Sequence, residues 1–356
     1  MAICKGKYDV IILGGGIAGS ICAWQIKLRN PHANIMLVDD QLLPHRKPCS
    51  TFLFQYIMQY LPDLIPSVVY CDNTIHTFQI DYEVTPNRQQ TVFPILNLQR
   101  DLLDEWLFSY NQQIGIECIS NLEFKSYAVG QTYCKVFFWN KTTEKEQNID
   151  ATLIIDAMGK NSSLIQYVQD QRRSYMVYSK LLYIKDTDTT LSSNILYLLT
   201  GNSFSDKYGS WIAKKNDLWV LGCRASTQQS CDEHIETTLA WLDKHYKLTS
   251  KPIFYEEAQE KHYYDICYGK NRIIPIGDAL YTNSYRIFNC DMAILSAWKC
   301  AEAVTKSLWH YDHALTRYTK LMKKIISSIN DFDQIGDHYS ASRKISKKIG
   351  KKLYLA

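Results

Sequence analysis

Apolar and polar positions follow two different periods near the start of the chain. Residues 8–13 form a nearly continuous apolar run rich in β-branched side chains, which predicts a buried parallel strand. Residues 17–28 have a helix-like pattern that stops at Asn30-Pro31, and residues 35–38 form a second apolar strand. The order strand, helix, strand predicts the first unit of an α/β sheet.

Further along the chain, similar patterns predict more elements of this kind. The predicted segments are an amphipathic helix at 98–107, strands at 151–155 and 272–276, and an apolar helix at 292–304. Residues 166–267 differ, because they are rich in Tyr, Trp and β-branched residues with alternating patterns typical of an antiparallel sheet. Within that region, 208–213 and 218–222 fit the two strands of a hairpin.

Length and composition describe an ordinary globular chain. Its 356 residues, 46% hydrophobic and 21% charged, suit about two domains. No apolar run approaches the roughly 20 residues of a membrane span, and the first residues lack the apolar core of a secretory signal, so we expect a cytoplasmic protein. The 11 cysteines include no Cys-x-x-Cys pair and the 9 histidines are dispersed, so we predict neither a metal site nor a disulfide framework.

The mild net charge of +4 is concentrated at the C-terminus. Six cations between Arg343 and Lys352 form a basic tail. They suit either a solvated helix end, where cations favour the negative pole of the helix dipole, or a docking element for an acidic partner or anionic lipid. No basic stripe with interleaved aromatics runs through the chain, so a nucleic-acid partner is not expected.

A glycine motif joins the first strand to the first helix. Residues 14–19 read Gly-Gly-Gly-Ile-Ala-Gly and satisfy G-x-G-x-x-G. Gly14 would permit the tight turn, Gly16 the approach of a pyrophosphate, and Gly19 close packing of helix on strand. The helix N-terminus offers N–H groups and positive charge to phosphates. Asp39, which directly ends the second strand, is a better candidate than Asp40 to accept hydrogen bonds from ribose hydroxyls. The sequence therefore predicts dinucleotide binding.

Three later segments resemble a known family, the flavoprotein superfamily of p-hydroxybenzoate hydroxylase, the flavin-dependent halogenases and the geranylgeranyl reductases. Arg100 opens a helix as the family's flavin-contacting arginine does. Residues 156–162 resemble the family's Asp-Ala-Asp-Gly-x-x-Ser turn. Residues 277–279 read Gly-Asp-Ala, whose aspartate in the family hydrogen-bonds the ribityl chain of FAD. The resemblance implies FAD as cofactor. The residues expected to contact it are Gly14, Gly16, Ile17, Ala18, Gly19, Asp39, Asp40, Arg46, Lys47, Arg100, Gly159, Gly277, Asp278, Ala279, Asp291 and Met292.

Two departures from the family pattern bear on chemistry. Met158 replaces the acid that the hydroxylases link to pyridine-nucleotide handling, which favours a separate flavin-reducing partner. Residues 281–291 lack the proline and Gly-x-Gly that normally approach the flavin, and Asp291 would add negative charge there. An altered flavin pose or unusual handling of its reduced form is therefore expected.

Two weaker matches point toward the geranylgeranyl reductases. Residues 45–50 resemble their Lys-Pro-Cys-Gly-like sequence, so Arg46 or Lys47 could pair with phosphates, and Cys49 could face the active cavity or fill a loop. Residues 208–213 loosely resemble their Tyr-Gly-Trp-x-Phe-Pro segment. The halogenases' tandem Trp signature is absent, which disfavours halogenation. Cys49 and Asp291 are the only catalytic candidates, both weak.

The resemblance implies a Rossmann-type FAD-binding domain, a mainly antiparallel β substrate domain and a helical C-terminal tail. The FAD domain would comprise residues 1–72, 97–165 and 268–304. Residues 73–96 and 166–267 would form the substrate domain, and 305–356 the tail. Tyr255, Tyr263, Tyr264 and Tyr268 could line an aromatic pocket, but sheet packing is the favoured interpretation because Tyr is a common sheet residue.

We predict an FAD-dependent monooxygenase acting on an aromatic substrate. In overall size and general sequence character, the chain is similar to a group of small flavoproteins. These act in cysteine tryptophylquinone biogenesis in glycine and lysine oxidases, where they oxygenate a tryptophan of the precursor protein. Such a precursor would dock on the basic tail. The alternatives are a geranylgeranyl-reductase-like flavoprotein that reduces isoprenoid double bonds, and a flavin-binding chaperone or scaffold that has lost its chemistry.

Overall fold

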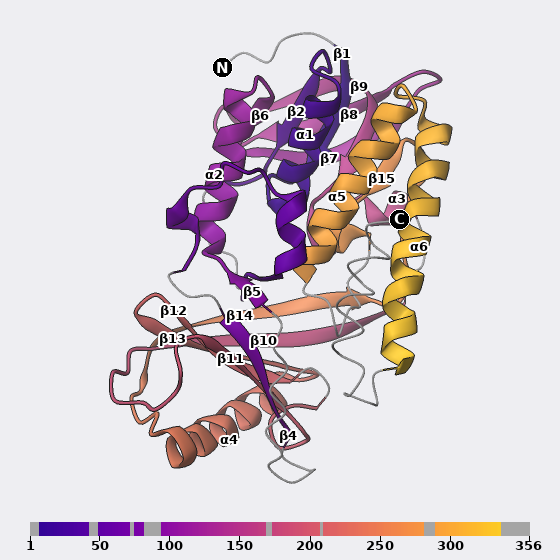
Figure 1. Cartoon of the computed structure of the whole chain (residues 1–356). Helices are drawn as coiled ribbons and strands as arrows, with labels where there is room; N and C mark the ends of the chain where they lie inside the picture. The colour runs from indigo at the N-terminus through magenta and orange to yellow at the C-terminus, as the bar shows by residue number, and fades with distance from the viewer. Residues whose placement is uncertain are drawn as a thin grey trace.

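Two sheets stacked one above the other organise the molecule (Figure 1). The computed structural model describes residues 7–42, 49–71, 75–81, 94–168, 173–206, 209–280 and 289–335. The mixed α/β architecture confirms the predicted fold class, a Rossmann-type domain with a mainly antiparallel second sheet and C-terminal helices.

The first sheet has seven strands and a parallel centre. Its order is β6-β2-β1-β9-β8-β7, with β15 also pairing with β9. The strands β1, β2, β6, β9 and β15 pair in parallel, whereas β7, β8 and β9 form an antiparallel meander. The bounds are β1 Lys7–Leu13, β2 Ile35–Val38, β6 Glu117–Ile119, β7 Leu122–Val129, β8 Cys134–Asn140, β9 Lys145–Asp156 and β15 Ile273–Pro275.

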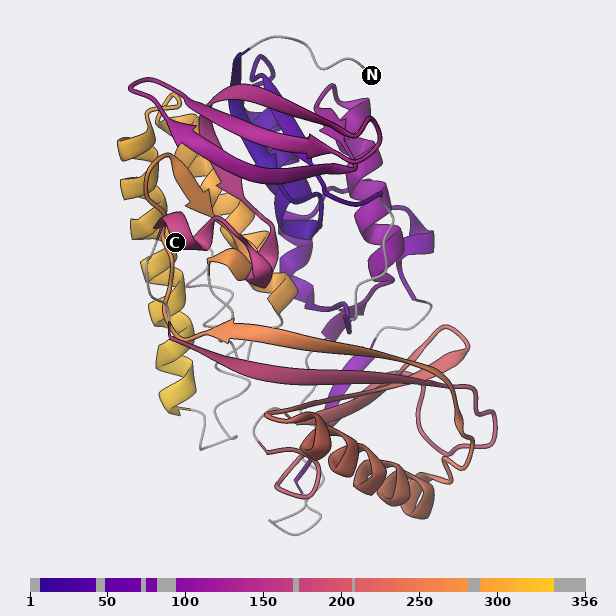
Figure 2. The same cartoon turned by 180° about the vertical axis from the view of Figure 1, so that it is seen from behind.

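Both faces of this sheet are covered, which is why its central strands are apolar throughout. In β1, Val10 and Ile12 face a core shared with four helices, while Ile11 and Leu13 face a second core under the meander. The four helices lie together on one side of the sheet (Figures 1 and 2). They are α1 Ile17–Arg29, α2 Arg100–Gln113, α5 Asn289–Lys306 and α6 Tyr311–Ile335.

The second sheet has eight strands in the order β14-β10-β13-β12-β11-β4-β5-β3. All neighbouring strands pair antiparallel except β4 and β11, which pair in parallel. Its outer face is covered by α4 Gln228–Tyr246, which packs Ile235 and Leu242 into the core below the sheet. The strands are β3 Phe52–Phe54, β4 Ile75–Asp81, β5 Pro94–Asn97, β10 Ser174–Ile184, β11 Ile195–Thr200, β12 Ser210–Lys215, β13 Leu218–Ala225 and β14 Pro252–Tyr263.

Short helical turns connect these layers. They are η1 Gln55–Tyr60, η2 Ser67–Val69, η3 Gly159–Asn161, α3 Ile165–Val168 and η4 Gly277–Ala279. Both η3 and η4 follow parallel strands of the first sheet, and they contact each other on the side that faces β14.

Several predicted elements differ in extent from those observed. The predicted helix at 98–107 begins at Arg100 and continues to Gln113, and the helix at 292–304 spans Asn289–Lys306. The hairpin prediction is confirmed, because β12 and β13 pair antiparallel. Residues 52–54, which the sequence groups with the first domain, pair with β5 in the second sheet. The sequence around this strand does not indicate which sheet it joins, because a strand of three residues is too short to show the alternation of apolar and polar positions.

Candidate functional site

The carboxyl ends of four parallel strands meet along one edge of the first sheet. The backbone N–H of Gly14 donates to Val38 O at 2.7 Å, joining the ends of β1 and β2. Ala157 N donates to Leu13 O at 2.8 Å, and Ile276 N to Asp156 O at 2.9 Å. This edge of a doubly wound sheet is where ligands bind, so the three predicted motifs share one site.

The glycine motif adopts the conformation that its sequence predicts. Gly14 has φ +108°, and a Cβ there would collide with the carbonyl of Ala157. A Cβ on Gly19 would collide with the carbonyl of Gly14, so the start of α1 approaches the turn as closely as glycine allows. Gly16 is the N-cap residue of α1 and has no side chain to cap the first turn. Ile17 and Ala18 are buried, so they can face a ligand only with their backbone N–H groups.

The two adjacent aspartates have different environments. Asp39 is 5% exposed and accepts hydrogen bonds from Gly15 N at 2.8 Å and Gln41 N at 3.0 Å. A carboxylate has about four acceptor positions, so Asp39 retains capacity for a ribose hydroxyl. Asp40 is exposed and lies 3.6 Å from the ammonium of Lys141. The structure therefore directs Asp39 toward the glycine motif and Asp40 toward the surface.

The Gly-Asp-Ala motif lies directly against the first one. Gly277 has φ +60°, and a Cβ on it would lie 3.1 Å from Cβ of Ala18 and 3.7 Å from Cβ of Ala293. Its N–H donates to Ser296 Oγ at 2.9 Å, which ties the motif to α5. Gly277 thus sits where the N-terminal turns of α1 and α5 converge.

Asp278, the next residue, has no hydrogen-bond partner among the residues that the structure describes. Burial raises the pKa of its carboxyl, although the charges of Lys160, His262 and Arg100 act in the opposite direction. A poorly solvated carboxylate beside cations, with unused acceptor positions, suits hydroxyl donors of a ligand. Ala279 is fully buried and can contribute only backbone atoms.

The turn after β9 is stabilised by Asp156, which the sequence did not single out as a site residue. Its carboxylate accepts from Met158 N at 3.1 Å and from Ser162 Oγ at 2.6 Å. Gly159 has φ +78°, and no atom lies within 4 Å of where its Cβ would be. The turn therefore leaves open space at Gly159.

Arg100 connects the site to two thiols. Its Nε donates to Asp104 at 2.8 Å, and its Nη1 lies 3.5 Å from Cys49 Sγ and 3.7 Å from Cys290 Sγ. The two sulfurs are 3.6 Å apart. The hydrogen bond from Cys290 and the charge of Arg100 hold the pKa of Cys49 well below its usual range despite burial. The same hydrogen bond and burial raise the pKa of Cys290.

Asp291 follows in the first turn of α5 and is fully buried. One carboxyl oxygen accepts from Phe54 N at 3.3 Å, while the other has no partner among the described residues. Burial raises the pKa of Asp291 well above its usual range. The negative charge expected there is therefore disfavoured, because this environment solvates it poorly. The buried hydroxyl of Tyr56 also lacks a partner in the part of the chain that the structure describes, and the side chain of Met292 packs into the core.

A second buried polar group, which the sequence analysis missed, joins the two sheets. Lys160 in η3 forms an ion pair with Glu260 of β14, and His262 Nε2 lies 3.1 Å from the other oxygen of Glu260. Glu260 and His262 are 6% and 4% exposed. Although burial alone would raise it, the hydrogen bond from His262 and the charge of Lys160 hold the pKa of Glu260 well below its usual range. The sequence did contain a signal for this group, because Glu260 and His262 are two positions apart in a strand and therefore lie on the same face of the sheet.

The four tyrosines considered as a pocket lining lie in different environments. Tyr255 and Tyr264 are 61% and 49% exposed, while Tyr263 is buried and Tyr268 packs against the first core. This arrangement agrees with the favoured interpretation that they are sheet residues. Arg46, Lys47 and the basic tail at 343–352 lie outside the described residues.

The structure contributes two further observations on its described part. No group of three or more His, Cys, Asp and Glu side chains there could hold a metal ion. None of the helices described is long and apolar enough to cross a membrane.

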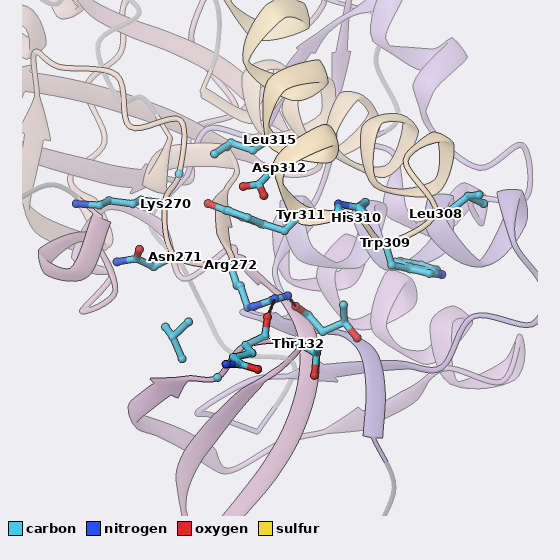
Figure 3. Close-up of a pocket in the computed structure, with 15 residues that line it drawn as sticks. Thr132, Lys270, Asn271, Arg272, Leu308, Trp309, His310, Tyr311, Asp312 and Leu315 are labelled. Carbon is cyan, nitrogen blue, oxygen red and sulfur yellow. Dashed lines mark hydrogen bonds between the residues drawn. The ribbon is translucent and has the colours of Figure 1, made fainter.

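A cavity of about 710 Å³ lies elsewhere, between the β7–β8 turn and the turn joining α5 to α6 (Figure 3). Arg272 crosses it and donates to Thr152 O at 3.1 Å and Gln131 O at 2.6 Å. Helix α5 begins at the motif site and ends beside this cavity, and its 18 residues span about 27 Å. The cavity is therefore at the opposite edge of the sheet and is not the cofactor site.

Comparison with known proteins places this geometry in a structural class. No protein-family model matches the sequence, and no curated protein matches it. Among solved structures, the chain is similar to the flavin-dependent brominase Bmp2, with 15% identity and a TM-score of 0.77 over 98% of this chain and 93% of that one. The fold is therefore that of flavin-dependent enzymes.

Two other likenesses extend across nearly the whole chain. A geranylgeranyl bacteriochlorophyll reductase-like protein from Thermoplasma acidophilum is 14% identical with a TM-score of 0.74, over 98% of this chain and 89% of that one. The tetracycline destructase Tet(51) is 15% identical with a TM-score of 0.63, over 98% and 97%. At such identities the likeness establishes the fold and leaves the reaction to the residues.

Proposed function

We propose that this chain is an FAD-dependent oxidoreductase. The observation that carries the proposal is the convergence of Gly277 on Ala18, because it brings together two motifs that the family uses for adjacent parts of FAD, the pyrophosphate and the ribityl chain. The uncapped start of α1 suits the pyrophosphate, Asp39 the adenosine ribose, and Asp278 the ribityl hydroxyls. The start of α5 would face the flavin ring, where its dipole favours negative charge.

The reaction we propose is oxygenation of an aromatic substrate. Bound FAD, when reduced, would supply the electrons for activating dioxygen. The chain would bind and orient the cofactor, and the second sheet would cover it from water. The carboxyl of Asp291 and the hydroxyl of Tyr56 are buried groups with unused hydrogen-bonding capacity, among the described residues, beside this region. Their place supports a polar ligand atom near the start of α5.

The electron source we propose is a separate reductant. Met158 occupies the position of the acid that the hydroxylases link to pyridine nucleotides, and its N–H is already bonded to Asp156. We therefore expect NADPH to reduce the flavin slowly when it acts directly, and a partner reductase to reduce it faster.

The substrate we propose is a tryptophan side chain of a precursor protein, modified during biogenesis of a quinone cofactor. Support comes from the size of the chain and from the six cations at 343–352, which suit an acidic docking segment. Reduction of isoprenoid double bonds is the second candidate, favoured by the fold shared with the geranylgeranyl reductase-like protein.

The cofactor proposal is tested by titrating the flavin-free chain with FAD. Gly16→Val would crowd the pyrophosphate and Asp278→Ala would remove the ribityl partner, so both variants should bind FAD at least about tenfold more weakly. Asp217→Ala, an exposed change in the β12–β13 turn, is the control and should bind normally. Normal FAD binding by both site variants would refute the assignment.

The reaction is tested with the FAD-loaded chain, a reductant and the candidate substrates, with and without dioxygen. Oxygenation adds one oxygen atom to a tryptophan of the precursor only when dioxygen is present. Addition of two hydrogen atoms to an isoprenoid lipid without dioxygen would instead establish the reductase. If neither product forms, the monooxygenase proposal is wrong and a scaffold role remains.

A further inference from the structure

Cys49 and Cys290 form a thiol pair with features that the proposed oxygenation does not use. The residues are 241 positions apart, yet their sulfurs lie 3.6 Å from each other. Cys49 is partly exposed and Cys290 is 8% exposed. The guanidinium of Arg100 lies within hydrogen-bonding distance of both sulfurs. A thiolate beside a cation and a second thiol is the arrangement of a peroxide-reactive cysteine with its resolving partner.

From this geometry we infer that Cys49 and Cys290 are a peroxide-oxidised pair that forms a reversible disulfide. Cys49 is the attacking thiolate, Cys290 is the resolving thiol, and hydrogen peroxide is the oxidant. The inference does not depend on the proposed function, because it needs only the two thiols, Arg100 and added peroxide.

The chemistry balances in two steps. The Cys49 thiolate attacks one oxygen of hydrogen peroxide, so an S–O bond forms, the O–O bond breaks and hydroxide leaves. Sulfur is thereby oxidised by two electrons to a sulfenic acid. The sulfur of Cys290 then attacks Cys49 Sγ, the S–O bond breaks, and the departing hydroxide leaves as water with the proton of Cys290. The sulfurs must approach by about 1.6 Å to reach bonding distance, a movement within reach of side-chain rotation.

The charges around the pair favour this assignment of roles. Arg100 faces both sulfurs and stabilises the Cys49 thiolate, while Cys290 keeps its proton and donates it to Cys49. Lys215 is a second, half-buried cation: desolvation lowers its pKa, while both thiols act to raise it. Burial raises the pKa of Asp291, the nearest acid on α5, and charge on Asp291 raises the pKa of Cys290, which favours Cys290 as the protonated partner.

The chain contains a matched pair for comparison. Cys22 and Cys300 also share a hydrogen bond, but both are fully buried. Burial raises the pKa of Cys300, and no cation acts on it. This pair has close thiols without exposure or a stabilised thiolate, so peroxide should leave it reduced.

Oxidation would connect two walls of the candidate cofactor site. Cys49 precedes β3 and Cys290 lies in the first turn of α5, so the disulfide would fix the segment before β3 against the helix start. It would also remove the thiolate that faces Arg100, the arginine expected to contact the flavin. Peroxide would therefore alter the site at the point where α2 and α5 begin.

The test treats the full reduced chain with a small excess of hydrogen peroxide and maps its peptides by mass spectrometry. We expect loss of two thiols, one cross-linked peptide joining Cys49 to Cys290, reversal by dithiothreitol, and no link between Cys22 and Cys300. Cys290→Ser should stop at a sulfenic acid on Cys49, trapped by dimedone. If Cys49 and Cys290 stay reduced, or if Cys22 and Cys300 oxidise first, the inference is wrong.

Arg100 provides a second test. Arg100→Gln should slow the loss of the Cys49 thiol at least about tenfold, and Arg100→Lys should restore most of the rate. Equal rates in all three proteins would refute the role of the cation. FAD content is measured separately from the flavin absorbance. A colourless chain that forms the disulfide would refute only the cofactor proposal, and a yellow chain that does not form it would refute only this inference.

Discussion

The carboxylate of Asp39 accepts a hydrogen bond from the backbone N–H of Gly15 at 2.8 Å, across 24 positions of sequence. The residue that would bind the ribose thus also fixes the loop that would bind the pyrophosphate. One buried carboxylate therefore determines the geometry of both parts of the site. A change at Asp39 should affect both the stability of the fold and cofactor binding.

Replacing Asp39 by Asn therefore should weaken both properties. An amide can accept from Gly15 N only by turning its NH2 group toward the N–H of Gln41, which leaves two donors facing each other. We expect a loss of about 1–3 kcal/mol in urea denaturation and weaker FAD binding. Asp40→Asn is the control, because its exposed pair with Lys141 should contribute under about 1 kcal/mol. Equal effects of the two variants would contradict the assignment.

The raised pKa of Asp291 predicts a specific pH dependence of stability. Unfolded Asp ionises near pH 4, whereas the buried carboxyl keeps its proton to higher pH. The native state then binds more protons than the unfolded state, so the stability from this group is full below about pH 4 and falls as pH rises toward the folded pKa. Asp291→Asn lacks this loss, and its stability relative to wild type should rise by up to about 1.4 kcal/mol per pH unit. Denaturation at pH 5, 6 and 7 measures this change, and a stability difference that stays constant with pH would argue against a raised pKa of Asp291.

Cys49 and Cys118 should differ in reactivity although both are partly exposed. The hydrogen bond from Cys290 and the charge of Arg100 hold the pKa of Cys49 well below its usual range, whereas burial and Glu117 raise the pKa of Cys118 to about 12. Alkylation of Cys49 by iodoacetamide should therefore be faster, and should depend less steeply on pH between 6 and 8. Alkylation of Cys118 should rise about tenfold per pH unit. Parallel profiles for the two thiols would contradict the predicted thiolate.

Replacing Glu260 should reduce the stability of the fold more than replacing Glu257, which lies on the same strand. Glu260→Gln removes the charge opposite Lys160 and His262 in a buried setting, which should cost about 3 kcal/mol. Glu257→Gln breaks a pair with Lys180 on the exposed face and should cost less than about 1 kcal/mol. Thermal unfolding of both variants compares them directly. Similar losses would show that the Lys160–Glu260 pair does not join the sheets.

Deleting residues 343–356 tests the docking proposal. FAD content should be unchanged, while modification of the precursor should slow to the rate that wild type shows in high salt, because charges at an interface rim act mainly on association and are screened. The measurement is the rate of precursor modification in low and high salt. A truncated chain that works at the full rate in both would make the tail a solvated helix end.

The sequence alone determined the parts of this protein whose signals are local. A glycine needed at positive φ, an apolar run and an acid at a strand end act within a few residues of each other, so the strand-turn-helix unit around Gly14 and the turn at Gly277 could be predicted. Asp39 could be preferred to Asp40 for the same reason. The fold class followed from the order of these units.

Only the tertiary structure decided what depends on burial and on distant contacts. Nothing near Cys49 in the sequence indicates Cys290, and the side chain of Arg100 reaches both because α2 and α5 begin at the same edge of the sheet. The raised pKa of Asp291 arises because neighbouring elements exclude solvent from its carboxyl. The Lys160–Glu260 pair exists because two sheets meet there. Local sequence patterns do not predict such contacts, because desolvation and the proximity of distant residues arise only when the whole chain packs.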